Sequence, residues 1–254
     1  MLKNIKEYVT NRKAEIKAEV ENMSLKPSLL IIRNSDDKAS ERYVRNKIKD
    51  CDEVGIHADE FFINTTSDSY AQYMASMLTR HYQGVIVQLP AAIKHPDALF
   101  TETQDVDGFI NPNVVPCTPK GIMDYLEYCG YTDFSGINVL IINRSDIVGR
   151  PLAKQFLNKN ATTIVAHSKT RDLKQLMPAA HIIVTAVGKP NFITKDMIRD
   201  DQIVIDVGIA FDENGKLCGD CEKGMGDNVT PVPGGVGLLT RLALLENVMN
   251  INRR

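Results

Sequence analysis

Short apolar runs alternate with amphipathic stretches along most of the chain. Three short runs in the first half are strand-like; they cover residues 28–33, 56–63 and 84–89. The stretches between and after them place apolar residues at helical spacing, over 39–55, 67–81 and 95–100. Strands that alternate with helices in this way predict parallel βαβ units.

The second half repeats this alternation more regularly. Strands are expected at 138–143, 161–167, 181–187 and 202–209, and helices at 119–129, from near Pro151, at 172–180, and from Val236 to about Asn250. Pro119 suits a first helical turn, and Gly130 suits a helix C-cap. Between the halves, residues 103–118 are rich in turn signals, and we place a domain junction near Cys117. The pattern predicts a two-domain α/β protein.

Composition excludes several classes of protein. The chain has 254 residues, 43% of them hydrophobic, and a formal charge of −2, with an isoelectric point near 6.2. This balance gives no basic surface for nucleic acid. The longest apolar runs fall far short of the roughly 20 residues of a membrane helix, and the charged N-terminus has no signal-peptide pattern. We expect no membrane partner and a cytoplasmic location.

The five cysteines favour burial over chemistry. Cys51, Cys117 and Cys129 fall in apolar patterns that suit small buried side chains. Cys218 and Cys221 have C-x-x-C spacing, but no second Cys or His pair completes a tetrahedral zinc site. We therefore expect no metal, and a reduced hairpin or loop at that pair rather than a redox site.

The segment after the strand at 138–143 has features of a phosphate-binding turn. In a doubly wound sheet, phosphates bind where the first strand passes into its helix, because free N–H groups and the helix dipole favour anions there. Gly149 permits close backbone approach, Arg144 and Arg150 supply charge, and Pro151 can open the helix. The segment is not G-x-G-x-x-G, so a simple turn at Gly149 with solvated arginines is the alternative.

The end of the next strand indicates which dinucleotide binds. NAD enzymes commonly carry an acid there, roughly 20 residues past the glycine loop, for the ribose 2′-hydroxyl. This chain has none, and it offers donors suited to a 2′-phosphate instead: His167, Ser168, Lys169, Thr170 and Arg171. Asp172 is better placed as the N-cap of the following helix. We expect NADP as the cofactor.

The first half carries a second group of candidates. Tyr43 and Lys47 lie four residues apart in a predicted helix and so point from one face. A partly desolvated lysine can act as acid or base, and an aromatic neighbour can stack on a flat ligand. The alternative is a solvated lysine beside a half-buried tyrosine. Gln88 ends a strand, where open α/β sheets bind ligands.

Two loops complete the set of candidates. Asp105 and Asp107 could be paired carboxylates, a metal site or an Asp-Gly turn, and their spacing favours the turn. Residues 230–237, with two prolines and three glycines, form a rigid loop that allows close approach to a ligand or connects two domains.

Nine segments, in order, resemble the bifunctional methylenetetrahydrofolate dehydrogenase/cyclohydrolase family. They are YVRNKIKDCDEVGI, GVIVQLP, DVDGF, PCTPKGIMDYL, NRSDIVGRP, AHSKT, TAVGKP, IVIDVGI and TPVPGGVG. The resemblance implies NADP-dependent oxidation of 5,10-methylenetetrahydrofolate to the methenyl form, and hydrolysis of that form to 10-formyltetrahydrofolate in one cleft. It implies a folate domain of residues 1–118 plus 238–254, to which the last helix returns, and a Rossmann domain of residues 119–237. The family commonly forms homodimers through the nucleotide domain.

The resemblance also implies a role for particular residues. Lys47 would catalyse the hydrolytic step, Gln88 would tune it, Tyr43 would stack on the folate, and Asp107 would hydrogen-bond the pterin. Further implied substrate contacts are Leu89, Pro233, Gly234 and Gly237. Implied NADP contacts are Asn143, Arg144, Ser145, Gly149, His167, Ser168, Val187, Gly188 and Ile209.

Five departures from the family pattern stand out. Asn143 replaces the usual Gly, Leu238 replaces a Pro, Ala91 and Ala92 replace Leu-Pro, and both the loop at 113–116 and the segment before Thr230 are short. They keep two alternatives open: a monofunctional dehydrogenase, and a non-catalytic NADP or folate binder. A shikimate-dehydrogenase-like oxidoreductase is a third.

Overall fold

The computed structural model describes residues 1–251 and leaves the side chain of Ala39 undescribed. Its contacts divide the chain into two compact units. The four-strand unit comprises Met1–Val9 and Thr118–Thr240, and the three-strand unit comprises Thr10–Cys117 and the residues from Arg241 onward. The domain boundaries implied by the resemblance stay a prediction, and their last three residues, 252–254, lie outside the described part.

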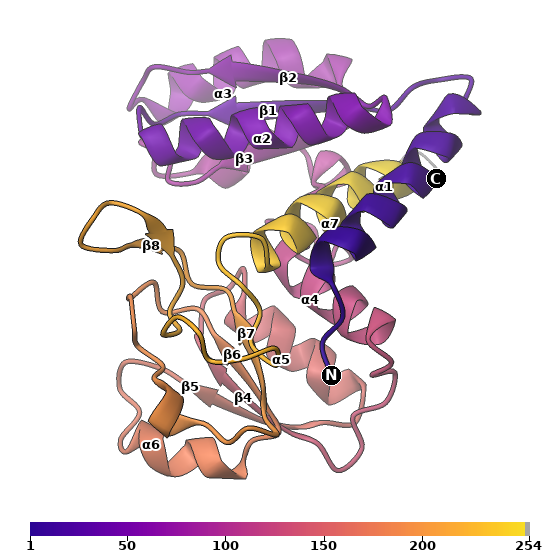
Figure 1. Ribbon diagram of the computed structural model, residues 1–254. Coiled ribbons are helices and arrows are strands. Elements are labelled where there is room, and N and C mark those ends of the chain that lie inside the picture. Colours follow the sequence, from indigo (N-terminus) through magenta and orange to yellow (C-terminus); the bar gives the residue numbers. More distant parts are fainter. Residues whose placement is uncertain (252–254) are drawn as a thin grey trace. The chain divides into compact units, whose positions relative to one another are not determined.

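The three-strand unit is built on a parallel sheet with order β2-β1-β3. Its strands are β1 (Ser28–Arg33), β2 (His57–Phe62) and β3 (Gly84–Gln88), close to the predicted runs. On one face, Leu30, Ile32 and Val85 pack against α3 (Asp68–Leu78). Helix α2 (Lys38–Val54) covers the other face (Figure 1). Short 3₁₀ turns follow at Thr79–His81, Pro96–Leu99 and Glu102–Gln104.

Local chemistry sets both ends of α2. The Asp37 side chain accepts a hydrogen bond from the Ser40 N–H, which is an N-cap. Gly55 ends the helix in the left-handed region, at φ 81°, where a side chain would be strained. Because α2 begins only five residues after β1 ends, its first turns lie near the carboxyl edge of the sheet.

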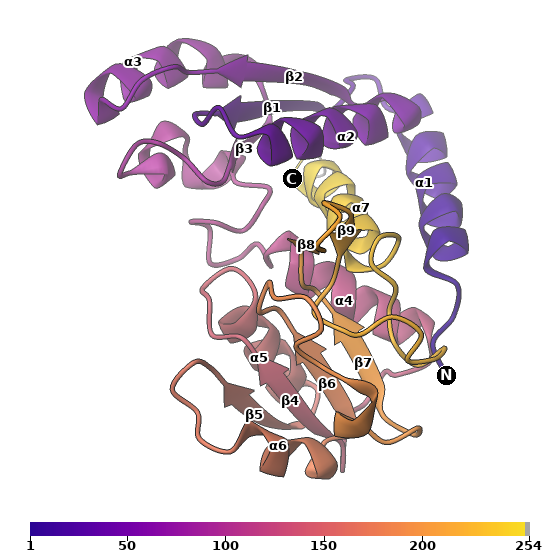
Figure 2. The same ribbon diagram turned by 60° about the vertical axis from the view of Figure 1, so that its left-hand side comes forward.

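The four-strand unit has a parallel sheet with order β5-β4-β6-β7. Its strands are β4 (Asn138–Ile142), β5 (Thr162–Ala166), β6 (Ile182–Thr185) and β7 (Ile203–Asp206), and they lie side by side in Figures 1 and 2. Helices α4 (Cys117–Tyr128) and α5 (Gly149–Asn158) pack on the face that carries Val139 and Ile141. The α6 region packs on the face that carries Leu140 and Ile142. This is a doubly wound α/β layer arrangement.

Several predicted bounds in this unit are wrong. The strand expected at 202–209 ends at Asp206, because the Asp206 carboxylate accepts the N–H of Gly208 and turns the chain. A hairpin of β8 (Ala210–Phe211) and β9 (Leu217–Cys218) follows. The helix expected at 172–180 is only α6 (Leu173–Leu176), continued by a 3₁₀ turn at Met177–Ala179 that contains a proline.

Two long helices occupy the ends of the chain. They are α1 (Ile5–Glu21) and α7 (Val236–Ile251), side by side in Figure 1. From Arg241 onward, α7 belongs to the three-strand unit: Glu246 accepts from Arg12 at 2.9 Å, and the Asn247 amide donates to the Val106 carbonyl at 2.9 Å. The expected return of the last helix to the first domain is confirmed. Among residues 1–251, no helix is long and apolar enough to span a bilayer.

Candidate functional site

A cavity of about 860 Å³ opens at the carboxyl ends of β4, β5 and β6, within the four-strand unit. Parallel strands deliver their following loops to one edge of a sheet, so three loops converge there. The lining residues are Ile142, Asn143, Arg144, Ser145, His167, Ser168, Thr170, Asp172, Leu173, Lys174, Gln175, Ala186, Val187, Lys189, Phe192 and Met197. Six of the nine predicted NADP contacts are therefore brought together in one place.

Asn143 organises the turn that leads from β4 into α5. Its amide oxygen accepts the N–H of Ser145 at 2.8 Å, the hydroxyl of Ser145 at 2.7 Å and the N–H of Gly149 at 3.1 Å. Its amide nitrogen donates to the Ala186 carbonyl at 2.8 Å. The departure from glycine at this position thus ties together two loops that line the cavity.

Gly149 is required by close packing of the backbone. A Cβ there would lie 2.1 Å from the Asn143 carbonyl oxygen, so any larger residue would displace the turn. Helix α5 begins at Gly149 rather than near Pro151, so the proline lies inside its first turn. Arg150 agrees with the alternative prediction of a solvated arginine, because its side chain is exposed and pairs with Asp146.

The cavity carries donors that suit an anion. Arg144 and Ser168 are exposed there, and in the described part of the chain their side chains form no hydrogen bond or ion pair. His167 accepts the N–H of Lys169 on Nδ1, which leaves Nε2 as its donor. Lys174 and Lys189 also line the cavity and were missed by the sequence analysis. The position of Lys189 directly after Gly188 was the available signal.

Three predicted cofactor residues are not among the lining residues: Gly149, Gly188 and Ile209. Gly149 and Gly188 act through their backbones, and Ile209 is 48% exposed in the segment before β8. Asp172 occupies the N-cap position of α6 but makes no side-chain cap bond, because its backbone is left-handed at φ 50°. Its predicted N-cap position is confirmed, although its side chain does not cap the helix, and it also lines the cavity.

The residues of this cavity fit a phosphorylated dinucleotide. Its volume lies within the usual range of roughly 300–1,000 Å³ for ligand pockets. Its charged lining is mainly cationic, with Arg144, Lys174 and Lys189 against the single acid Asp172. Exposed hydroxyl and guanidinium donors at strand ends match the needs of phosphate groups.

In the three-strand unit, the structure brings Lys47 and Gln88 together. The Lys47 ammonium donates to the Gln88 amide oxygen at 2.9 Å, and the Gln88 amide nitrogen donates to the Leu89 carbonyl at 2.9 Å. These two hydrogen bonds fix the orientation of the Gln88 amide, because its oxygen must face the Lys47 ammonium. Tyr43 lies one turn earlier in α2 and is half-buried, and burial raises the pKa of its hydroxyl.

Asp105 and Asp107 have different roles. Asp105 is fully buried, and its carboxylate accepts four backbone N–H groups of residues 107–111. It therefore shapes the turn, as its spacing predicted. Asp107 is half-buried beside Cys117, and burial raises the pKa of its carboxyl while the nearby Lys47 charge opposes the shift. Residues 1–251 contain no group of three or more His, Cys, Asp or Glu side chains placed to hold a metal ion.

Cys117 is a neighbour of this site that the sequence analysis assigned to packing alone. It is buried, as are Cys51 and Cys218, whereas Cys129 is only partly covered. Burial and the Asp107 carboxylate raise the pKa of the Cys117 thiol well above its usual value. Cys218 and Cys221 are free thiols in and after the β8–β9 hairpin.

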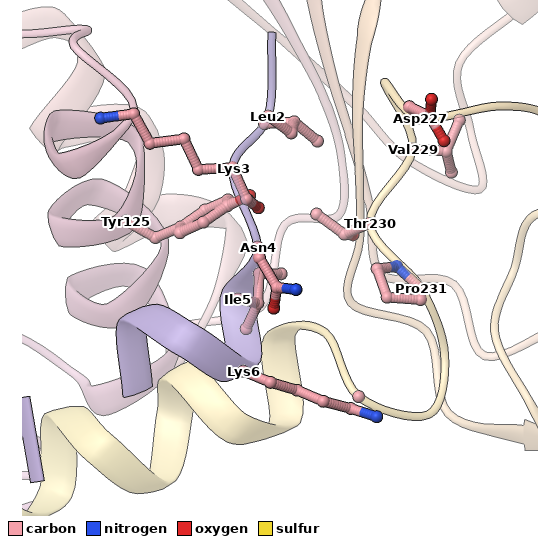
Figure 3. A pocket seen from close by; sticks show the side chains of 11 residues that line it. Leu2, Lys3, Asn4, Ile5, Lys6, Tyr125, Asp227, Val229, Thr230 and Pro231 are labelled. Atoms are coloured by element: carbon pink, nitrogen blue, oxygen red, sulfur yellow. The ribbon is translucent and has the colours of Figure 1, made fainter. Parts of the chain in front are cut away.

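The predicted substrate loop lies in the four-strand unit. Pro233 and Gly237 are exposed, and Gly234 has a left-handed backbone at φ 98°. Gly234 borders a second, smaller cavity of about 280 Å³. Figure 3 shows its walls: residues Leu2 to Lys6 run past Tyr125 on one side, opposite Thr230 and Pro231.

Comparisons with known proteins agree with this arrangement. Residues 3–107 match the family model described as the tetrahydrofolate dehydrogenase/cyclohydrolase catalytic domain, and residues 116–254 match the NAD(P)-binding domain of the same family. The bifunctional protein FolD of Campylobacter curvus is 41% identical over 93% of this chain and 91% of its own length. FolD of Lysinibacillus sphaericus is 37% identical over 97% of this chain and 94% of its own.

Solved structures show the same likeness. The bifunctional FolD methylenetetrahydrofolate dehydrogenase/cyclohydrolase of Campylobacter jejuni superposes with a TM-score of 0.92 at 33% identity, covering 100% of this chain and 99% of its own. The Trypanosoma brucei enzyme, solved with NADP cofactor and inhibitor, gives 0.90 at 27% identity, covering 100% and 97%. With family models matching both halves, this chain belongs to the tetrahydrofolate dehydrogenase/cyclohydrolase family.

Proposed function

We propose that this protein oxidises 5,10-methylenetetrahydrofolate with NADP and hydrolyses the resulting methenyl form to 10-formyltetrahydrofolate. The observation that carries the proposal is the hydrogen bond from Lys47 to Gln88, beside the half-buried Asp107. A lysine whose ammonium is held by a neutral amide can take up or release a proton at a defined position. Family membership supplies the substrate class.

For the dehydrogenase step, NADP supplies an acceptor for the hydride that leaves the methylene carbon. Arg144, Ser145 and Ser168 would hold its phosphates, since they place guanidinium and hydroxyl donors in the cavity. Asn143 would hold the turn that presents them, and Val187 and Lys189 would form the opposite wall. The chain's part in this step is alignment and charge compensation, with no dedicated acid.

For the hydrolytic step, water adds to the methenyl carbon and gives one proton to the neutral amine form of Lys47. The Lys47 ammonium then returns this proton to N5, the C–N5 bond breaks, and the remaining hydroxyl proton leaves to solvent, so that the formyl group stays on N10. Gln88 would direct the Lys47 ammonium, since its amide oxygen already accepts from it. Asp107 would accept from the pterin amino and ring N–H groups, and Tyr43 would stack on the ring.

Further contacts belong to this proposal. The exposed Leu89 would offer an apolar contact to the folate, and Pro233, Gly234 and Gly237 remain the predicted substrate loop. We also propose a cytoplasmic location, which suits five free cysteines. No nucleic-acid partner is proposed for a chain with a net charge of −2.

A homodimer through the four-strand unit is part of the proposal. Strand β5 lies at the edge of its sheet, and Val165 on it is 38% exposed. An open strand edge with an exposed apolar side chain favours pairing with a second chain.

One progress curve tests the proposed function. The purified protein is given methylenetetrahydrofolate and NADP, and NADPH and methenyltetrahydrofolate are followed by their absorbances. We expect NADPH to form without accumulation of the methenyl compound. Accumulation would indicate a monofunctional dehydrogenase, and NADP binding without any NADPH would indicate a non-catalytic binder. A parallel reaction with NAD, expected to be slower, tests the cofactor preference.

A further inference from the structure

We propose that Asp220, a buried residue outside the cavity, is a positioning residue for the dinucleotide-binding loop at residues 186–189. The inference rests on the proposed use of NADP. Ala186, Val187 and Lys189 line the cavity, whereas Asp220 does not. Asp220 would therefore act on the cofactor only through the shape of this loop.

The Asp220 carboxylate holds three successive backbone N–H groups of the loop. Its Oδ2 accepts the N–H of Val187 at 2.7 Å, and its Oδ1 accepts those of Gly188 at 2.7 Å and Lys189 at 2.9 Å. Gly188 has φ 75°, which lets consecutive N–H groups point to one side. Successive N–H groups in such a turn form an anion-binding concavity, and here a carboxylate fills it.

The carboxylate itself has little freedom to move. Asp220 is fully buried, and its own N–H donates to Asp206 Oδ1 at 3.0 Å. A Cβ at Gly208 would lie 2.3 Å from the Asp220 carboxyl, and a Cβ at Gly219 would lie 2.1 Å from the Asp206 carboxyl. Both glycines are thus packed against the two acids, so neither acid can shift without moving backbone.

The negative charge of the buried Asp220 is satisfied mainly by hydrogen bonds from the loop at residues 186–189. Within residues 1–251, no lysine or arginine side chain pairs with it. Its charge is balanced by the three N–H groups and by the hydroxyl of Thr185, which donates to Oδ2 at 2.7 Å. Loss of the loop conformation would leave a buried charge unsatisfied, so carboxylate and loop stabilise each other.

Asn143 holds the same loop from its other end. Its amide nitrogen donates to the Ala186 carbonyl, one residue before the segment that Asp220 binds. The loop is therefore attached at both ends before any ligand arrives. A preformed wall lowers the entropy lost when a ligand binds.

The test compares Asp220→Asn with Thr185→Val. The amide of Asp220→Asn would turn an N–H₂ toward at least one backbone N–H of the loop, which distorts it. Thr185→Val removes a bond to the same carboxylate but leaves all three loop bonds in place. We expect Asp220→Asn to raise the NADP KM and the calorimetric NADP Kd by about tenfold or more. We expect Thr185→Val to change both by less than about threefold.

Hydrolysis of methenyltetrahydrofolate without NADP is the internal control. Asp220→Asn should keep it within about twofold of the wild type, because this step needs no nicotinamide. An unchanged NADP Kd, or an equal loss of hydrolysis and NADP affinity, would overturn the positioning role. If Asp220→Asn does not fold, Asp220→Ser, which keeps one acceptor oxygen, decides by the same readings. A wild-type protein inactive with NADP would instead overturn the proposed function.

Discussion

The side-chain amide oxygen of Asn143 lies 3.1 Å from the backbone nitrogen of Gly149, whose N–H it accepts at the start of α5. The N–H groups of Ser145 and Gly149 are therefore already bonded within the protein. At the proposed NADP site, these two N–H groups would be occupied, whereas the Arg144 side chain would be available to a phosphate.

Asn143→Asp should weaken NADP binding. The carboxylate can still accept the two N–H groups, but it loses the donor to the Ala186 carbonyl and adds a negative charge near the phosphates. We expect the NADP KM to rise by about tenfold or more. Steady-state kinetics with varied NADP measures this, and a KM within twofold of the wild type contradicts it. Methenyl hydrolysis should be unaffected.

Lys47→Met should abolish methenyl hydrolysis. The substitution keeps the length of the side chain but removes the group that we assign to proton transfer, for which losses of about 10²–10⁴-fold are usual. The matched control is Lys49→Met, because Lys49 is exposed on the same helix. Hydrolysis is followed by the decay of methenyltetrahydrofolate absorbance. Hydrolysis at the wild-type rate in the Lys47 variant would contradict the proposed mechanism.

Protonation of Asp107 should weaken folate binding at acidic pH. Burial raises the pKa of its carboxyl above 3.8, so it protonates at a higher pH than an ordinary Asp and loses its ability to accept the pterin N–H groups. We expect the folate KM to rise as the pH falls through this raised pKa. Asp107→Asn should remove this pH dependence and raise the KM by about tenfold or more.

The raised pKa of Asp107 also predicts that the folded protein loses stability as the pH rises. Because the folded pKa lies above the unfolded value of 3.8, the stability from proton binding is complete below 3.8 and is lost as the pH rises through the folded pKa. Asp107→Asn, which carries no charge, should therefore gain stability relative to the wild type as the pH rises. Urea denaturation at pH 4 and pH 7 measures the difference. The prediction is contradicted if the stability of Asp107→Asn relative to the wild type is lower at pH 7 than at pH 4.

Asp50 should contribute far more to stability than its exposed neighbour Glu53. Asp50 is 4% exposed and pairs with Lys13 at 2.5 Å and Arg241 at 3.0 Å, joining α1, α2 and α7. Asp50→Ala leaves two cations without their shared anion and should cost about 3–5 kcal/mol. Glu53→Ala is the control: Glu53 also pairs with Lys13 but is exposed, so its loss should cost under about 1 kcal/mol. Equal costs in urea denaturation would contradict the prediction.

Val165→Lys should disrupt the proposed homodimer. A lysine on the edge strand β5 opposes strand pairing with a second chain. Light scattering should show a dimer for the wild type and a monomer for this variant. Val115→Lys is matched in exposure, at 37% against 38%, but lies in the other unit and should remain dimeric. A wild-type monomer, or dimers in all three proteins, would contradict the interface.

The sequence predicted the order and type of nearly all helices and strands, because periodicity and turn residues are local properties. It failed where hydrophobic spacing continues past the point at which an element ends. The strand expected at 202–209 ends at Asp206, because its carboxylate accepts the N–H of Gly208. The helix expected at 172–180 covers only Leu173–Leu176 and then continues as a 3₁₀ turn. Neither event is encoded in hydrophobic spacing.

For the site, the sequence by itself determined which residues are candidates and, through resemblance, what chemistry they serve. Only the tertiary structure decided that Lys47 meets Gln88, that Asp107 keeps a half-buried carboxyl, and that Asn143 and Asp220 hold one loop from two ends. These contacts join residues far apart in the sequence: Gly188 and Asp220 are 32 positions apart, and Asn143 and Ala186 are 43 apart. Such distances close only when the sheet brings strand ends to one edge, which no local pattern specifies.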